Sequence, residues 1–492
     1  MNLAEAIARQ ARHRPHRTAI VQGERLVSFG ELQRIVLAVA AHLARAGAGE
    51  GTRLAVSMGN TPEHVAAMLA IARIGAVAVA ANPTASEELR AGIAARYRAA
   101  LLVREPSARP IAGLAEVVVA AGGGDAAGLP VPAAAPGGAA PWRIALSSGT
   151  TGVPRGTAWS HRRTLAQFLF QLSSERNSTG QRYLIPLDLN IAFALHATLR
   201  LLLDGATVVM ADDADPAAIV RLVDRHGVDH LRTSPAVISR LLEALPRGSG
   251  HLERLQSLTL GGSPVSQELM QRIRTRLTPR VTLDYGATEF GGVARCDPLL
   301  HARHPEAAGR LQPWVEVRIE DEDGQALPAG SVGRVGLRAL GEGPEGYVDD
   351  PEATARAYRD GWFYPGDLGS LTEGGVLLLA GRSDDVVSLG GVKINLSEVD
   401  LALQSHPDVV EGAGFVVQSP RGTTVLVAAV VAAPGLDEAA LRRHCAQRLR
   451  GQAPAHVLKV AALPRNAAGK VVRRELARRV RVAPASPASG AA

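Results

Sequence analysis

Apolar positions along the chain follow two spacings, short runs typical of buried strands and longer stripes typical of helices. In the first hundred residues the runs TAIVQG, RLAVSMGN and AVAVAANP alternate with helical patterns over 29–46 and 61–74. The alternation returns from Ile144, with strands expected at ATVVMA, HLRTSP, SLTLGG and RVTLDYG and helices at 216–225 and 235–245. This rhythm predicts an α/β fold.

The pattern changes towards the C-terminus. Residues 314–379 show short strands with turns, and a small α+β pattern follows Gly381, with strands GAGFVVQ and TVLVAAVVA and helices at Leu396 and Asp437. Residues 104–141 are rich in Ala, Gly and Pro and are interpreted as a loop or linker, and 481–492 as a disordered tail. We expect a large N-terminal domain over 1–382, with stacked α/β subdomains and a small β-rich subdomain, and a small mobile α+β C-terminal domain over 383–480.

Length and composition narrow the class of protein. A chain of 492 residues is too long for one ordinary core. Two cysteines exclude a disulfide framework and fit a reducing cytoplasm, where we expect the protein to act. The longest apolar run, 425–433, is far below the roughly 18 residues of a membrane span. Monomer and homodimer both stay open.

The charge pattern favours a small-molecule enzyme over a nucleic-acid binder. The net charge is +7, but the charges are spread singly and aromatic residues make up only 3% of the chain, so stacking platforms are scarce. Among the 54 basic residues only Lys393, Lys459 and Lys470 are lysines. A lysine kept against so strong an arginine bias is a candidate for a role that a guanidinium cannot fill.

The stretch LSSGTTGVPRG, residues 146–156, has the composition of a polyphosphate loop. Its glycines permit close backbone approach, its consecutive N–H groups can form an anion nest, and Arg155 adds a permanent charge. It is not a Walker A loop, because Pro154 stands where that pattern requires its second Gly and no Lys is present in the stretch. A mobile Gly/Ser/Thr surface loop is the plain alternative.

Four further stretches carry candidate chemistry. LGGSPVS follows a strand; DYGATEFGG offers Tyr285 for stacking and Glu289 for Mg²⁺; YPGDLG places Asp367 in a glycine turn; and PRNAAGKVVRREL carries Lys470. Each alone is equally explained by turn chemistry or helix capping. Their occurrence together, in this order, is not plausibly chance.

Taken together, these motifs resemble the adenylate-forming superfamily of acyl-CoA synthetases, nonribosomal peptide adenylation domains and luciferases, over residues 3–476. The resemblance implies that ATP, Mg²⁺ and a carboxylic acid are bound. It assigns the β- and γ-phosphates to the loop residues Ser147, Ser148, Gly149, Thr150, Thr151, Gly152 and Arg155. It assigns the adenine to Gly261, Gly262 and Tyr285, and the same nucleotide-binding stretches contain Ser263, Asp284 and Gly286.

The resemblance also implies the catalytic residues. Thr288 would contact the α-phosphate, Glu289 would hold Mg²⁺, and Asp367 with Arg382 would bind the ribose. Asp384 would be the domain hinge. Lys470 would reach the carboxylate and α-phosphate, where a compact ammonium enters a crowded site better than a guanidinium.

The sequence departs from the family at a few positions. Arg155 stands where the phosphate loop usually has Lys, and Pro365 where Thr usually precedes Gly-Asp. Ser388 replaces a frequent Lys, and Trp314 follows Pro313 where Gly is usual. Neither Pro365 nor Ser388 stands for a group that the mechanism clearly needs, and the effects of Pro365 on the Asp367 turn and of Trp314 on the strand entry stay open.

The sequence says less about which carboxylic acid is bound. Ala192 stands near the position of the Asp that clamps the ammonium in amino-acid-activating members, Asp188 is a weaker candidate, and Leu189 aligns with the family's His or aromatic residue. An uncharged acid is therefore favoured over an amino acid. His196 either lines the acyl pocket or belongs to the core.

The acceptor is expected to be CoA, because LGGVK, with Gly390, Gly391 and Lys393, resembles the loop beside the pantetheine tunnel of CoA ligases. A separate acyl carrier protein is the alternative, since no carrier segment follows the Lys470 motif. A ligase using another acceptor and a non-catalytic nucleotide-binding paralogue also stay open.

Overall fold

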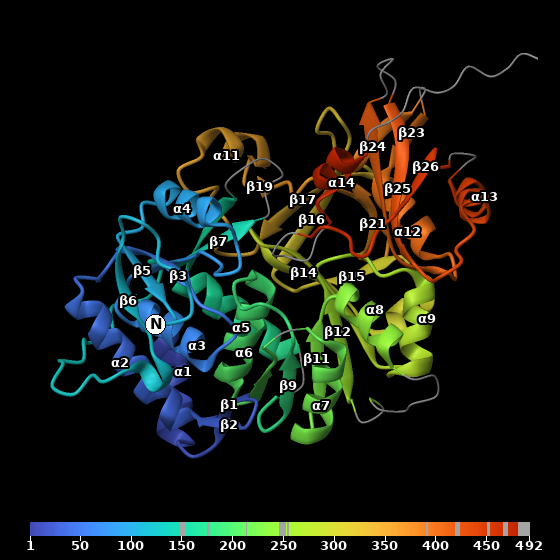
Figure 1. Ribbon diagram of the computed structural model, residues 1–492. Helices are drawn as coiled ribbons and strands as arrows, with labels where there is room; N and C mark the ends of the chain where they lie inside the picture. The colour runs from blue at the N-terminus through green and yellow to red at the C-terminus, as the bar shows by residue number, and fades with distance from the viewer. Residues whose placement is uncertain are drawn as a thin grey trace, which may run out of the picture.

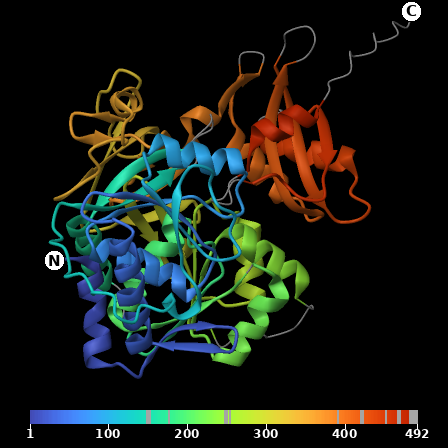
Figure 2. The same cartoon turned by 60° about the vertical axis from the view of Figure 1, so that its left-hand side comes forward.

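The computed structural model describes the chain except residues 148–153, 175–177, 213, 246–251, 253–254, 390–391, 419–423, 450–452, 466–470 and 481–492. The side chains of 173–174, 388 and 392–393 are likewise not described. A large body holds the chain up to Arg382, and the elements that follow form a smaller lobe above it (Figures 1 and 2).

The first subdomain is built on a sheet with the strand order β6-β5-β3-β4-β7-β8, parallel except for the antiparallel β7–β8 hairpin. Thr61 caps α3 by accepting from the His64 N–H, and Pro62 begins the helix, a favourable arrangement for a helix start. The elements are α1 Leu3–His13, α2 Phe29–Arg45, β3 Arg53–Ser57, α3 Pro62–Arg73, β4 Val77–Ala80, α4 Glu87–Arg96, β5 Leu101–Arg104, β6 Ala115–Val118, η1 Ala121–Gly123, β7 Pro141–Ser147 and β8 Arg155–Ser160.

The second subdomain continues the α/β rhythm. Its central strands run in the order β13-β12-β11-β9-β10-β1, all parallel, and β2 closes the edge antiparallel to β1. The elements are β1 Thr18–Gln22, β2 Arg25–Ser28, α5 His161–Ser174, β9 Arg182–Ile185, α6 Ala192–Asp204, β10 Thr207–Met210, α7 Pro216–His226, β11 His230–Thr233, α8 Pro235–Ala244, β12 Ser257–Gly261, α9 Gln267–Arg276 and β13 Val281–Ala287.

A β-rich subdomain extends the same sheet through antiparallel pairing from β13 onwards. Its last strand, β21, ends at Arg382. The elements are β14 Gly291–Cys296, α10 Pro298–Arg303, β15 Ala307–Leu311, β16 Val315–Glu320, β17 Gly333–Ala339, α11 Pro351–Ala357, β18 Tyr358–Arg359, β19 Trp362–Phe363, β20 Asp367–Leu371 and β21 Val376–Arg382.

The small lobe has its own sheets, β22–β23 and β24-β25-β26, and its own buried clusters. It contacts the large body where Ser239 Oγ of α8 donates to the Val410 carbonyl at 3.3 Å. The elements are η2 Ser383–Asp385, β22 Val386–Leu389, β23 Val392–Asn395, α12 Leu396–Gln404, β24 Val409–Gln418, β25 Thr424–Ala432, α13 Glu438–Arg448, β26 His456–Lys459 and α14 Arg473–Arg479.

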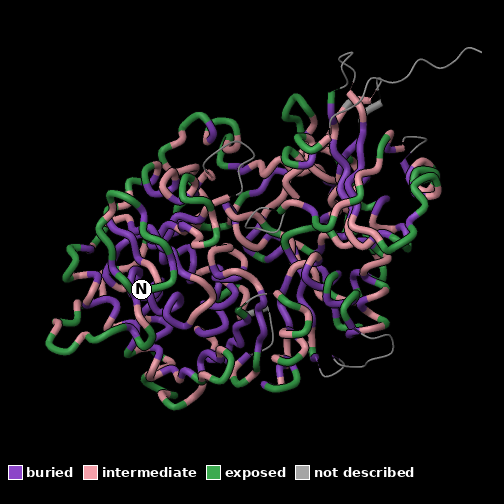
Figure 3. The backbone as a smooth tube through the Cα atoms, in the orientation of Figure 1, coloured by how far each residue is buried: buried purple, intermediate pink, exposed green. Residues whose placement is uncertain are grey.

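Buried residues concentrate along the sheets of both parts, with exposed segments at the loops (Figure 3). The predicted run at 425–433 is indeed a strand with a buried centre, β25. The interpretation of 104–141 as a loop was incomplete, because β6 lies within it and pairs in parallel with β5. Within the described residues no helix is long and apolar enough to cross a bilayer.

Candidate active site

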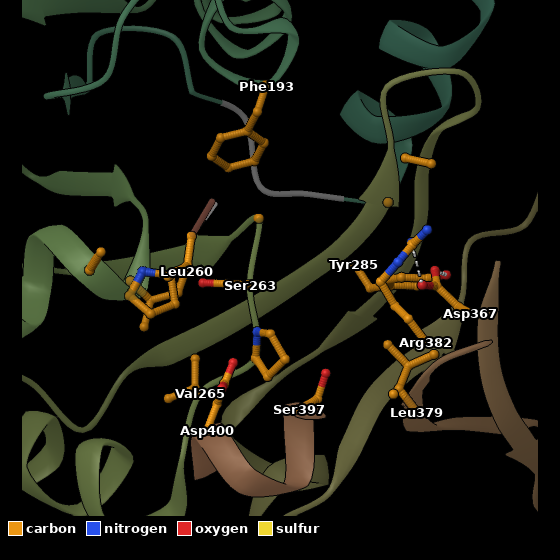
Figure 4. Close-up of a pocket in the computed structure, with 18 of the residues that line it drawn as sticks. Phe193, Leu260, Ser263, Val265, Tyr285, Asp367, Leu379, Arg382, Ser397 and Asp400 are labelled. Atoms are coloured by element: carbon orange, nitrogen blue, oxygen red, sulfur yellow. Dashed lines mark hydrogen bonds and ion pairs between the residues drawn. The ribbon is translucent and has the colours of Figure 1, made fainter. Parts of the chain in front are cut away.

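A cavity of about 2520 Å³ lies between the body and the small lobe, and Figure 4 shows part of its wall. It is lined by the ends of β12, β13, β20 and β21, by α6, and by residues of α12 in the lobe. Ligands of α/β folds typically bind at the carboxyl ends of the strands, where the loops diverge. Most of the sequence-predicted site residues that the structure describes line this cavity.

Three predicted residues meet directly, although nearly a hundred positions separate the first from the last. The Tyr285 hydroxyl donates to Asp367 Oδ2, and Arg382 Nη1 donates to Asp367 Oδ1 at 3.0 Å (Figure 4). Burial, together with the Asp367 carboxylate, raises the pKa of Tyr285 well above its ordinary value, so the phenol stays a donor. The cluster presents an aromatic ring and a carboxylate, the groups suited to a base and its ribose hydroxyls.

Backbone geometry fixes this carboxylate. Asp367 begins β20 and pairs across the ladder with Arg382 on β21. Gly366 has φ +84°, a left-handed conformation that favours glycine, and a Cβ there would come 3.0 Å from Arg382 Nη2. Pro365 precedes this turn, so the departure from the family pattern accompanies an intact Asp367–Arg382 pair.

The glycines at the end of β12, Gly261 and Gly262, permit close approach of backbone and ring. A Cβ on Gly261 would lie 3.2 Å from the Phe193 ring and from the Asp284 carbonyl oxygen. Gly262 has φ +92°, and Ser263 follows it at the edge of the cavity (Figure 4). This stretch therefore leaves a flat backbone surface facing the cavity.

The segment after β13 is held by side chains of β8 and α5. Trp159 Nε1 donates to the Thr288 carbonyl at 3.2 Å, and Arg163 donates to the Glu289 carbonyl. Arg163 also lies 3.8 Å above the Trp159 ring, a cation–π contact. These bonds fix the backbone of Thr288 and Glu289, both of which line the cavity.

Glu289 is 8% exposed, and its Oε1 accepts a hydrogen bond of 3.0 Å from the Tyr347 hydroxyl. Burial, then the Glu289 charge, raises the pKa of Tyr347 far above its ordinary value, so this donor persists. Among the described residues no group of three His, Cys, Asp or Glu side chains could hold a metal. A single carboxylate fits Mg²⁺, which binds one or two carboxylates together with substrate phosphates and waters.

The expected phosphate loop falls between β7 and β8, which pair as antiparallel strands. Its residues Ser148, Gly149, Thr150, Thr151 and Gly152 lie outside the described residues, but both ends are described, with Ser147 opposite Arg155 in the ladder. Ser147 Oγ donates to the Arg155 carbonyl at 3.3 Å.

Tyr347 connects the hairpin to the rest of the site. The Arg155 guanidinium lies 5.6 Å from the Tyr347 ring, and the same tyrosine donates to Glu289. Sequence reasoning missed Tyr347, because EGYVDD has no motif character. The hairpin end and the expected Mg²⁺ residue are therefore adjacent.

Asp284 is engaged by arginines. Arg295 donates to both of its oxygens, at 2.7 and 3.0 Å, and Arg232 Nη2 donates to Oδ2. Burial opposes ionisation, but Arg295 and Arg232 hold the pKa of Asp284 below its usual value. Asp284 and Gly286 lie on either side of Tyr285, and a Cβ on Gly286 would come 2.3 Å from the Gly291 carbonyl oxygen.

Aromatic side chains line the predicted acid pocket. His196 of α6 lines the cavity, its ring lies 4.5 Å from Trp159 and 5.9 Å from Phe168, and burial lowers its pKa well below the ordinary value. Ala192 also lines the cavity. Asp188 instead accepts from Asn82 and from the backbone N–H of Asn190, so its carboxylate is used locally.

The expected catalytic and acceptor residues of the small lobe are only partly visible. Lys470, Gly390 and Gly391 lie outside the described residues, and Lys393 is on β23 with its side chain not described. Asp384 lies in η2, directly after β21 ends, and its side chain is 80% exposed.

Arg473, three residues after Lys470, is anchored in the lobe and reaches towards the expected hinge. It donates to Asp400 at 2.6 Å and to the Gly414 carbonyl at 2.9 Å, and lies 3.9 Å from Asp385. Sequence reasoning did not single out this contact, which joins α14 to the segment where the two parts connect.

Comparisons with known proteins agree with this geometry. The family described as AMP-binding enzyme matches residues 7–341, and the AMP-binding enzyme C-terminal domain matches 398–470. Feruloyl-CoA synthase of Amycolatopsis sp is 31% identical, covering 96% of this chain and 97% of that protein. 4-Coumarate–CoA ligase 5 of Oryza sativa subsp. japonica is 29% identical, covering 95% and 91%.

Solved structures show the same fold over nearly all of the chain. The amide bond synthetase McbA from Marinactinospora thermotolerans superposes with a TM-score of 0.83 at 29% identity, covering 96% of this chain and 98% of that one. ATP-bound MatB from Rhodopseudomonas palustris gives 0.86 at 26%, covering 97% and 99%. The chain therefore belongs to the AMP-binding enzymes, within the adenylate-forming superfamily of AMP-forming acid–thiol ligases.

Proposed function

We propose that this protein joins a carboxylic acid to CoA in two steps driven by ATP. In the first, a carboxylate oxygen attacks the α-phosphorus, the bond to the β-phosphate oxygen breaks, and acyl-adenylate and pyrophosphate form. In the second, the CoA thiol attacks the acyl carbon, loses its proton, and AMP leaves. The convergence of Tyr285, Asp367 and Arg382 in one cavity, beside Glu289, carries this proposal.

Each group in the cavity has a role in the first step. Asp367 accepts the ribose hydroxyls, Tyr285 stacks on the adenine, and the Gly261–Gly262 backbone lies along it. Arg155 and the loop before it hold the outer phosphates, and Thr288 contacts the α-phosphate. Mg²⁺ beside Glu289 would neutralise the departing pyrophosphate.

The lobe supplies the remaining group. Lys470 stabilises the charge that gathers on the α-phosphate and the bridging oxygen. The lobe then moves about the hinge near Asp384, so that the loop with Gly390, Gly391 and Lys393 lies beside the path of the pantetheine arm. The domain boundaries 1–382 and 383–480 belong to this proposal and agree with the end of β21 at Arg382.

The relatives suggest the kind of acid. 4-Coumarate and ferulate ligases act, by their names, on aryl acids, and aromatic side chains at Phe168, Phe193 and His196 line the cavity here. An acid with a flat or bulky apolar middle fits such a wall.

One observation favours a second acceptor. McbA, 29% identical over nearly the whole chain, is named an amide bond synthetase, so an amine is the alternative nucleophile in the second step. The first step is the same in both cases.

Acid-dependent exchange of labelled pyrophosphate into ATP, run over a panel of aryl and alkyl acids, tests the first step. The same preparation is then supplied with CoA, an acyl carrier protein or an amine. We expect exchange with at least one acid and thioester with CoA. Exchange that does not depend on an acid contradicts the proposal. Product from an amine but not from CoA would mean that an amine, not CoA, is the acceptor in the second step.

A further inference from the structure

A buried arginine in the cavity wall carries positive charge that its neighbour only partly balances. Arg232, on β11, is 7% exposed and lines the cavity. Its Nη2 donates to Asp284, whereas its Nε is buried and has no hydrogen-bond partner in the part of the chain that the structure describes. Because Nε is enclosed by protein, a ligand reaches Arg232 only through the accessible 7% of the residue that lines the cavity, and an anion there would offset the cost of burying the positive charge.

Asp284 is already neutralised by another residue. Arg295 makes a two-pronged contact with it, Nε to Oδ1 at 2.7 Å and Nη2 to Oδ2 at 3.0 Å. Because these charges keep the pKa of Asp284 low despite its burial, it is a carboxylate at neutral pH. Arg232, Arg295 and Asp284 together therefore carry one positive charge in excess. Arg200 of α6 lines the same cavity, and its charge also lowers the pKa of Asp284.

This charge lies on the acyl side of the cavity. Successive side chains of a strand leave opposite faces, so Asp284 points away from Tyr285, which contacts Asp367. The Arg232 guanidinium lies 5.6 Å from the ring of Phe193, and that ring projects from α6 into the cavity (Figure 4). Gly261, between β11 and β13, has no side chain that would separate Arg232 from Asp284.

We propose that the acid activated by this enzyme carries a second carboxylate, which binds Arg232 while the first carboxylate reacts with ATP. This inference rests on the proposed function and names its substrate class. The planar guanidinium fork matches a carboxylate, and the apolar middle of the acid lies against Phe193. The sequence argument against an amino acid is retained, since an ammonium group would face this positive charge. The expectation of an uncharged acid is replaced.

Matched pairs of acids test the proposal. Aliphatic dicarboxylic acids from malonate to sebacate, and the carboxy-substituted cinnamates, are each compared with their monomethyl esters in the pyrophosphate exchange assay. An ester keeps the reacting carboxylate and removes only the second charge. We expect the best dicarboxylic acid to exceed its ester at least about 10-fold in kcat/KM, as a charge-assisted contact implies.

Variants assign that preference to a residue. Arg232→Gln should bring the ratio of diacid to ester close to one, and Arg232→Lys should restore part of it. Arg225 lies on α7 and forms an exposed ion pair with Glu24, so Arg225→Gln is the matched control and should keep the wild-type ratio. The KM for ATP of each variant reports whether the nucleotide half of the site is intact.

The outcomes separate this inference from the proposed function. Exchange with esters or monocarboxylic acids equal to or better than with every diacid overturns the second carboxylate and leaves the function standing. A fall of equal size for diacid and ester in Arg232→Gln also overturns it, because that is the signature of a structural role. Absence of exchange with every acid contradicts the proposed function itself.

Discussion

Single side chains define the nucleotide end of this site. Asp367 accepts from Tyr285 and from Arg382, so one carboxylate orients both an aromatic ring and a guanidinium. The same carboxylate is expected to accept the ribose hydroxyls, so we expect ATP binding to depend strongly on it.

Asp367→Asn removes the charge and keeps the size. Because the amide cannot accept from the phenol, the guanidinium and a ribose at once, we expect the KM for ATP to rise about 10- to 100-fold, the effect of losing one or two charged hydrogen bonds. The KM for the acid should change much less. Initial-rate exchange kinetics with both substrates varied measure this, and an equal rise in both constants would contradict the assignment.

Lys470→Arg tests the lysine that the arginine bias singles out. The larger planar group should crowd the α-phosphate, and loss of such a contact typically costs about 10²–10³ in rate. Lys459→Arg is the control, because Lys459 contacts the Leu436 carbonyl and Glu438 in the lobe. Retention of wild-type exchange by Lys470→Arg would show that the assigned role is wrong.

Arg155→Lys should be tolerated, since the family pattern itself has Lys there, whereas Arg155→Ala should raise the KM for MgATP more than that for the acid. The Arg155 guanidinium lies beside the ring of Tyr347, whose hydroxyl donates to Glu289. Tyr347→Phe keeps the ring and removes only the hydrogen bond to Glu289, so it separates loss of the Arg155 charge from disturbance of Glu289. An unchanged ATP requirement in Arg155→Ala would remove the β7–β8 hairpin from the phosphate site.

At the scale of elements, two connections position the site. The β7–β8 hairpin brings Arg155 beside Tyr347, which donates to Glu289, and α14 brings Arg473 beside Asp385, next to the expected hinge. The second connection depends on Arg473, which joins Asp400, Gly414 and the region of Asp385.

Arg473→Ala should weaken the coupling between the Lys470 segment and the hinge. We expect a fall in kcat for exchange of about 10-fold, as for loss of one buried charge-assisted contact, with little change in the KM for ATP. Arg478→Ala, on the exposed face of the same helix, is the control. Equal thermal stabilities of the two variants would exclude general unfolding, and equal activities would contradict the positioning role.

At the scale of the whole molecule, the sequence predicted the alternating strands and helices well, because each strand is a short buried run between turns. It missed β6, whose four residues lie in an Ala/Gly/Pro-rich segment and become a strand only by pairing with β5. Local composition does not report such non-local pairing.

In the site, too, residues in local motifs were predicted and residues placed by non-local contacts were not. Tyr285, Asp367 and Arg382 were predicted because each lies in a recognisable motif, and the structure brings them together. Arg232 and Tyr347 were missed, because neither lies in a motif and their contacts with Asp284 and Glu289 join positions more than fifty residues apart. Residues that contact the acid differ with the acid, so no fixed pattern marks them.

Stability of the whole chain should fall in mild acid. His161 is fully buried and accepts from the Leu3 N–H at Nδ1, at 3.1 Å; burial, and then the amino terminus, lower its pKa to about 4. Its contribution is complete above the unfolded pKa of about 6.5 and is lost as pH falls towards 4. At about 1.4 kcal/mol per pKa unit, the lowered pKa of His161 accounts for about 3 kcal/mol of the free energy of unfolding at neutral pH.

His161→Gln keeps an acceptor and removes the titration. The free energy of unfolding, measured with denaturant at pH 7.0 and 4.5, should differ less between the two pH values in this variant than in wild type. His64 and His196, whose pKa values are also lowered by burial, remain in both proteins. The same loss of stability in both proteins would show that His161 is not the sensitive group.

We expect the acid to be activated through its adenylate. The most direct measurement is a single turnover with the acid labelled by ¹⁸O in both oxygens of the reacting carboxylate, followed by mass spectrometry of the products with CoA present. We predict AMP carrying one ¹⁸O, unlabelled pyrophosphate, and a thioester that retains the other ¹⁸O. Unlabelled AMP, or ADP with the label in inorganic phosphate, would contradict the account.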